Sequence, residues 1–156
     1  MAVAPIPPGY SSVTPYLIVR GAAKAIDFYK RAFGAVELFR FEGPDGTLGH
    51  AEIKIGNSPI MLADGGMEGY SDPLTLGGSA VSFMVYVPDV DAAFARAIAA
   101  GATVKRPVAD QFYGDRTGTL ADPFGHVWSI GTHIEDVSPA EMDRRHKELM
   151  KSGAAA

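Results

Sequence analysis

The hydrophobic and polar positions of this chain form a pattern that occurs twice. Residues 13–19 (VTPYLIV) and 81–87 (VSFMVYV) are apolar segments rich in β-branched and aromatic side chains, and they lie 68 residues apart. The same shift places residues 57–62 (NSPIML), a turn followed by an apolar segment, on residues 125–130 (GHVWSI). One offset that relates two pairs of predicted strands indicates a duplicated unit.

Each copy of the unit predicts one helix and four strands in the order βαβββ. In the first copy, Ile26, Tyr29 and Phe33 follow helical spacing, and Gly34 is a typical helix stop. In the second copy, Asp89 is a candidate N-cap, and Gly101 ends the helix. The predicted strands are 14–19, 36–41, 48–55 and 59–63, then 79–87, 103–108, 116–120 and 127–133, and the predicted helices are 22–33 and 90–100.

This pattern predicts an α+β fold of two βαβββ modules in tandem with a C-terminal helix. Ser138 and Glu141 form a capping box with Pro139 at the first helical position, which marks where that helix begins. We expect one structural domain overall. Its parts are an extended N-terminal arm (1–12), a first module (13–64), a glycine-rich linker (65–78), a second module (79–134) and a C-terminal helix (138–152).

Composition excludes several classes of function. The 156 residues are 47% hydrophobic and 21% charged, with a net charge of −4 and no basic run, so we expect no nucleic-acid partner. The absence of cysteine excludes disulfides, thiol catalysis and thiolate metal sites. The N-terminus lacks the pattern of a secretory signal and no apolar run reaches membrane-spanning length, so we expect a cytoplasmic protein without a membrane partner.

The chain resembles the vicinal oxygen chelate superfamily, which includes glyoxalase I, extradiol dioxygenases and the bleomycin- and fosfomycin-resistance proteins. Within it, the PhnB-like branch is the most similar. The resemblance implies the paired-module fold, a small-molecule ligand and a homodimer, with modules that pair within one chain or are swapped between two. The motifs that carry it are residues 9–10 (GY), 13–17 (VTPYL), 25–29 (AIDFY), 32–35 (AFGA), 49–53 (GHAEI), 114–116 (GDR) and 122–129 (DPFGHVWS).

The resemblance also implies four metal-ligand positions, and this chain does not fit them. Enzymes of the superfamily hold a divalent ion with His or Glu side chains from the first and last strand of each module. The matching positions in this chain carry hydroxyl or thioether side chains, which are poor ligands for such an ion. They are Thr14, Met61, Ser82 and Ser129. A slip of one residue would place Pro15, Leu62, Phe83 and Ile130 there instead, so we predict no metal at the standard positions.

Three other residues are fallback metal candidates. His50 and Glu52 are two apart on one predicted strand and therefore share a face, although a solvent-facing edge continued by Lys54 explains them better. His126 lies beside a turn, where an imidazole often hydrogen-bonds a carbonyl group of the loop, and a ligand or catalytic role is the less favoured interpretation. No cofactor is predicted, and a divalent metal is the alternative.

The residues that share a strand face with the four expected metal-ligand positions are mostly apolar, with a few hydroxyl groups. Together they would line an apolar cleft, and this composition is common in small-molecule pockets. Ordinary core packing is the competing interpretation. Arg116 is expected either to bind an acidic ligand or to pair with Asp115 or Asp122, while Trp128 should face away from the cleft and support a helix. The predicted ligand-binding residues are Thr14, Tyr16, Met61, Ser82, Met84, Tyr86, Phe112, Tyr113, Arg116 and Ser129.

These observations favour a metal-free protein that sequesters an aromatic or antibiotic-like compound. The alternative is a metal-dependent lyase or dioxygenase of the same superfamily with non-standard ligands. A purely structural role, in which the modules serve to dimerise, is a third hypothesis. The sequence assigns no catalytic residue and does not decide whether the protein is an enzyme.

Overall fold

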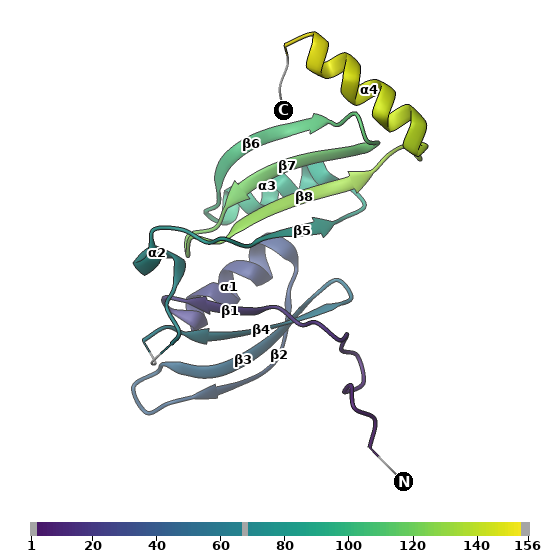
Figure 1. The fold of residues 1–156 in the computed structure, drawn as a ribbon. Coiled ribbons are helices and arrows are strands. Elements are labelled where there is room, and N and C mark those ends of the chain that lie inside the picture. The colour runs from purple at the N-terminus through teal and green to yellow at the C-terminus, as the bar shows by residue number, and fades with distance from the viewer. Residues whose placement is uncertain (1–2, 67–68, 154–156) are drawn as a thin grey trace.

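The computed structural model describes residues 3–66 and 69–153, so the first two residues of the predicted arm, two residues of the predicted linker and residues 154–156 lie outside it. The first module contains β1 (Tyr16–Val19), α1 (Ala22–Phe33), β2 (Val36–Glu42), β3 (Leu48–Ile55) and β4 (Ser58–Asp64). The second contains β5 (Ser82–Tyr86), α3 (Val90–Ala100), β6 (Thr103–Asp110), β7 (Asp115–Ala121) and β8 (Val127–His133). Two further helices are α2 (Pro73–Leu76), between the modules, and α4 (Pro139–Lys151) (Figure 1).

Both modules form a four-stranded sheet with the same topology, which confirms the predicted tandem fold. Sheet 1 has the order β1-β4-β3-β2, and sheet 2 has the order β5-β8-β7-β6. The predicted offset is present in the strand register. Tyr16 pairs with Met61 in sheet 1, and the residues 68 positions later, Met84 and Ser129, pair in sheet 2.

The ends of the two module helices follow the signals in the sequence. Gly34 ends α1 with a left-handed backbone at φ 67°, and Gly101 ends α3 at φ 119°. Only glycine adopts this region without a steric penalty. At the start of α3, the Asp89 side chain accepts a hydrogen bond from the backbone N–H of Ala92.

The two modules share one hydrophobic core because α1 and α3 pack against each other between them. The Arg96 side chain of α3 donates to the carbonyl of Ala32 in α1. The Trp128 ring, from sheet 2, lies 4.8 Å from the ring of Phe33 and 5.4 Å from that of Tyr29, both on α1. Trp128 therefore supports a helix, as predicted, and the helix belongs to the other module.

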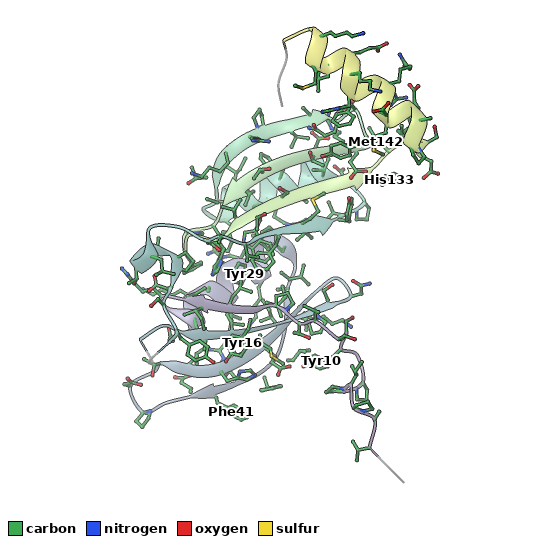
Figure 2. The ribbon with its side chains drawn as sticks, in the orientation of Figure 1. Tyr10, Tyr16, Tyr29, Phe41, His133 and Met142 are labelled. Atoms are coloured by element: carbon green, nitrogen blue, oxygen red, sulfur yellow. The ribbon has the colours of Figure 1, made fainter. Side chains whose placement is uncertain are left out.

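The remaining face of each sheet carries large apolar side chains that the rest of the chain leaves exposed. On sheet 1, Tyr16 is 44% exposed and Phe41 66%; on sheet 2, Met84 is 41% exposed and Tyr86 62%. We call these surfaces the open face of sheet 1 and the open face of sheet 2. Figure 2 shows Tyr29 between the two sheets, with Tyr16 and Phe41 on sheet 1.

Two connecting segments complete the fold. The predicted linker contains the short helix α2, whose N-cap Asp72 accepts from the backbone N–H groups of Leu74 and Thr75. Helix α4 buries no residue, and Arg145 ties it to Glu135 with bonds of 2.7 and 2.8 Å. Among residues 3–66 and 69–153, no helix has the length and apolar character needed to cross a membrane.

Candidate functional site

The predicted cleft residues are divided between the two sheets. Tyr16 and Met61 are paired neighbours in sheet 1, and Met84 and Ser129 are paired neighbours in sheet 2. Thr14 precedes β1, and Ser82 begins β5. The four positions that matched the metal ligands of the superfamily are therefore contributed in pairs by two separate sheets.

The open face of sheet 1 contains a chain of hydrogen bonds through Tyr16, His50 and Glu52. The Tyr16 hydroxyl lies 2.8 Å from His50 Nδ1, and His50 Nε2 lies 3.1 Å from Glu52 Oε1. A carboxylate only accepts hydrogen bonds, so His50 Nε2 carries the proton, and Nδ1 accepts from the Tyr16 hydroxyl. Burial, followed by the nearby Tyr70, raises the pKa of Tyr16 and keeps its hydroxyl protonated.

Glu52 is a buried carboxylate, and the expected solvent-facing edge at His50 and Glu52 is wrong. Strand β3 lies between β4 and β2, and Glu52 is only 6% exposed. Burial raises the pKa of Glu52. Within the described parts of the chain, its second oxygen, Oε2, is buried and makes no hydrogen bond. Glu52 is therefore costly to keep ionised, and buried carboxylates with a raised pKa are frequent at functional sites.

Aromatic rings surround this chain of hydrogen bonds. The His50 ring lies 5.5 Å from Tyr16, 5.8 Å from Phe39 and 6.3 Å from Phe41. The ring of Tyr70, from the segment before α2, lies 6.4 Å from Tyr16. We call Tyr16, Phe39, Phe41, His50 and Tyr70 the aromatic cluster. Sequence analysis missed Phe39, Phe41 and Tyr70, although the pairing of β2 with β3 brings the first two beside Glu52 and His50.

The open face of sheet 2 has a different set of titratable groups. Asp115 is buried and accepts from the Tyr86 hydroxyl at 2.7 Å and from His133 Nδ1 at 2.7 Å. Burial opposes ionisation of Asp115, but the hydrogen bonds from His133 and Tyr86 outweigh it and lower its pKa. The same bond, together with one to Asp136, raises the pKa of His133.

A small polar cavity of about 180 Å³ lies beside this group. Its polar lining is Arg106, Gln111, Thr117, Thr119 and Ser129, with Met84, Pro107, Tyr113 and Gly118 completing the wall. Thr119 Oγ1 and Ser129 Oγ lie 3.0 Å apart. We call this cavity the hydroxyl pocket. It gathers Met84, Tyr113 and Ser129 from the predicted cleft and adds residues that sequence analysis missed.

Two larger and more apolar cavities border β5. One of about 480 Å³ is bordered by Tyr16, Ile18, Phe83 and His126, and the other, of about 530 Å³, by Ser82, Met84 and Tyr86. His126 is buried, and its Nε2 lies 3.0 Å from the carbonyl oxygen of Ile18. His126 therefore bonds a carbonyl group, but this carbonyl belongs to β1 and not to the expected loop, so the bond joins the two modules.

Residues 111–114, the loop that contains Phe112 and Tyr113, and the start of β7 contact other parts of the protein. Arg116 forms a two-bond pair with Asp91, at 2.8 and 2.9 Å, and a further bond to Asp110 at 2.8 Å. Neither carboxylate is one of the two expected partners. Phe112 packs against His146 of α4, with ring centres 5.4 Å apart. Arg116 would have to leave two carboxylates in order to bind an acidic ligand.

The donor set at the open faces does not fit a divalent metal. Thr14, Met61, Ser82 and Ser129 offer hydroxyl and thioether groups, which coordinate such ions weakly. In the described part of the chain, no three His, Asp or Glu side chains are grouped as a metal site requires. His50 and Glu52 make one pair, and His126 is hydrogen-bonded elsewhere.

Comparisons with known proteins agree with this fold. The family model described as the Glyoxalase/Bleomycin resistance protein/Dioxygenase superfamily matches residues 11–130. An uncharacterised protein of Mycobacterium tuberculosis is 47% identical over 137 residues, which cover 84% of this chain and 79% of that protein. The crystal structure of TioX from Micromonospora sp. ML1 has a TM-score of 0.64 at 30% identity, covering 80% of this chain and 99% of that one.

A PhnB protein from Bacillus cereus shares the fold alone, with a TM-score of 0.61 at 20% identity over 78% of this chain and 99% of that one. The paired βαβββ modules, their common register and the family match all lead to the same assignment. The chain belongs to the glyoxalase/bleomycin resistance protein/dioxygenase superfamily.

Proposed function

We propose that this protein binds and sequesters a small aromatic, antibiotic-like compound on its open sheet faces without a metal ion at the standard positions. The observation that carries the proposal is the aromatic cluster, in which exposed rings surround the hydrogen-bonded chain of Tyr16, His50 and Glu52. A mostly apolar surface with a few convergent polar groups is the usual composition of a small-molecule site.

The exposed rings supply the apolar contact area. Phe41 is 66% exposed, Tyr70 50% and Tyr16 44%, so much of each ring is free to pack against a ligand. Aromatic side chains bury large areas and favour offset or edge-to-face contacts with another ring. A planar aromatic compound therefore matches this surface better than a flexible aliphatic one.

The hydrogen-bonded chain supplies direction. The Tyr16 hydroxyl already donates to His50, so its oxygen remains an acceptor for a ligand O–H or N–H. His50, itself hydrogen-bonded to Glu52, holds the Tyr16 ring in one orientation. We expect the bound compound to carry a hydrogen-bond donor at the edge of its planar ring system.

We propose that a second copy of the chain completes the cleft in a homodimer. Each open face exposes large apolar groups, such as Phe41 on sheet 1 and Tyr86 on sheet 2, and such patches on soluble proteins mark interaction surfaces. Both faces carry charged groups, with Glu52 on sheet 1 and with Asp115 and Arg106 on sheet 2. In the proposed dimer, the apolar groups on sheet 1 of one protomer pack against those on sheet 2 of its partner. The cytoplasmic location stays a prediction.

The alternative of a metal-dependent lyase or dioxygenase rests on His50 and Glu52, which lie 3.1 Å apart on the same face. Two side chains would need further ligands from a second copy of the chain or from the substrate. The proposal for metal-free binding is favoured because each of the two is already hydrogen-bonded within the chain of three residues.

A direct test uses 2-naphthol, a planar aromatic compound with one hydroxyl donor, in a calorimetric titration. Phe41→Ala should weaken binding about 5- to 10-fold, as loss of one aromatic contact predicts. Ile98→Ala is the matched control, since Ile98 is 42% exposed on α3, away from the open faces. Equal affinities for the wild type, Phe41→Ala and Ile98→Ala would contradict the proposal.

A further inference from the structure

The hydroxyl pocket occupies, in sheet 2, the place that the aromatic cluster occupies in sheet 1. Met61 pairs with Glu52, and its repeat mate Ser129 pairs with Thr119. By the same register, Thr117 corresponds to His50. The outer strand pairs, β2 with β3 and β6 with β7, also correspond. In the first, Phe39 pairs with Glu52, and in the second, Arg106 pairs with Thr119. Equivalent positions are therefore aromatic and acidic in one module and hydroxylic and basic in the other.

Arg106 differs from most arginines of this protein because the described residues give it no hydrogen-bond or ion-pair partner. Six others donate to an oxygen acceptor; they are Arg20, Arg40, Arg96, Arg116, Arg144 and Arg145. Arg31 also lacks a partner in these parts of the chain, and both side chains are exposed, Arg31 on α1 and Arg106 on β6. Of the two, Arg106 borders the hydroxyl pocket.

The rest of the lining suits an anion. Thr117, Thr119 and Ser129 each carry a hydroxyl, and the Gln111 amide is a further donor. The lining includes no Asp or Glu among the residues that the structure describes. Thr119 and Ser129 share one hydrogen bond, so one of their two protons is left for a ligand. A guanidinium beside hydroxyl donors is a common arrangement for binding carboxylate or phosphate oxygens.

We propose that the hydroxyl pocket is an oxyanion site that binds a carboxylate or phosphate-type group of the ligand through Arg106, Thr117, Thr119 and Ser129. The pocket, at about 180 Å³, has room for a carboxylate or phosphate group. This assigns the ligand class as a planar aromatic acid. The aromatic half of the assignment rests on the function proposed above, and the oxyanion site stands without it.

In the homodimer proposed above, one ligand spans two chains. Its ring packs on the aromatic cluster of one protomer, and its anionic group enters the hydroxyl pocket of the partner. Arg106 has a competing role in that arrangement, because it could pair with the partner's Glu52 instead of a ligand. The two roles make different predictions for stability and for anion binding.

The test measures binding of inorganic phosphate, benzoate and 2-naphthoate by calorimetry at constant ionic strength. The wild type should bind at least one of the two small anions, and the preference between phosphate and benzoate identifies which type of group the pocket accepts. Arg106→Gln should weaken that binding roughly 10-fold or more, because a charge-assisted hydrogen bond is lost. Arg31→Gln removes the same charge from the surface of α1 and should leave the affinity unchanged.

Three outcomes would overturn the oxyanion site. The first is wild-type protein that binds neither phosphate nor benzoate, and the second is equal weakening by Arg106→Gln and Arg31→Gln. The third is loss of the dimer in both Arg106→Gln and Glu52→Gln, with a double mutant no worse than either, which would make Arg106 an intersubunit ion-pair partner. Phe41→Ala separates the two proposals: it should weaken 2-naphthoate and 2-naphthol but leave phosphate binding unchanged.

Discussion

The Tyr29 hydroxyl donates a 2.7 Å hydrogen bond to Asp122 Oδ2, and this bond joins the helix of the first module to the final turn of the second. Asp122 is buried and also accepts from Trp128 Nε1 and from the backbone N–H groups of Phe124 and His126. One carboxylate thus fixes the turn before β8 and anchors α1. This contact therefore helps to fix the position of the two sheets relative to each other, with their open faces outward.

Tyr29→Phe should therefore destabilise the protein by about 1–3 kcal/mol, because a buried carboxylate loses a donor while keeping its other partners. Urea denaturation at neutral pH measures the change. Tyr70→Phe is a suitable control, since Tyr70 is half exposed and should change the free energy of unfolding by less than about 0.5 kcal/mol. Equal stability of the two variants would show that the bond contributes nothing to module packing.

His133 should make stability depend on pH. Its hydrogen bonds to Asp115 and Asp136 raise its pKa above the ordinary 6.5. The stability it contributes is fully present below the unfolded-state pKa of about 6.5 and is lost as the pH rises through the higher folded-state value. NMR titration should place the His133 midpoint above 6.5, and His133→Gln should remove this part of the pH profile. A midpoint at or below 6.5 would contradict the prediction.

Glu52→Gln should stabilise the protein at pH 7, by about 0.5–1 kcal/mol. Burial raises the pKa of Glu52, so ionised Glu52 favours the unfolded chain. The favourable contribution of protonated Glu52 is present below about pH 4.3 and is lost as the pH rises through its folded-state pKa. Thermal unfolding of both proteins between pH 4 and 8 is the measurement. Marked destabilisation by Gln at pH 7 would mean that the carboxylate is net stabilising.

Gly118→Ala should destabilise the protein by about 1–3 kcal/mol through overpacking. A Cβ at this position would lie 2.6 Å from Phe94 Cε2 and 2.8 Å from Val108 Cγ2, both packed on the helix side of sheet 2. Gly49→Ala is the matched control in sheet 1, where a new Cβ meets nothing within 4 Å. Unfolding of both variants at the same urea concentration would contradict this prediction. It would mean that Phe94 and Val108 move to make room for the added methyl group.

Much of the fold could be predicted from the sequence because local signals and the repeat agreed. Gly34 and Gly101 marked the helix ends, and the 68-residue offset paired Tyr16 with Met61 and Met84 with Ser129. Helix α2 was missed because four residues give too little periodicity. Its Asp72-Pro73 start was nevertheless a readable cap signal.

The site was harder to predict because it depends on which strands are central. The alternating polar residues His50 and Glu52 are typical of an edge strand. In the structure, β2 pairs with the outer side of β3, so β3 is not at the edge, and Glu52 is buried. Thr119 could have been found only by applying the repeat to β3 and β7, and Arg106 by applying it to β2 and β6, where the offset falls to 67. The partners of Arg116 were unpredictable, since Asp91 lies 25 residues away on α3.

The most direct test of the account is the metal content of protein purified without chelator, measured by mass spectrometry together with thermal unfolding in the presence and absence of Zn²⁺, Ni²⁺, Mn²⁺ and Fe²⁺. An ion that binds only the folded protein must raise its melting temperature. The account predicts far less than one equivalent of metal per chain and no rise with any of the four ions. One tightly held equivalent that is lost in the His50→Ala or Met61→Ala variant would contradict it.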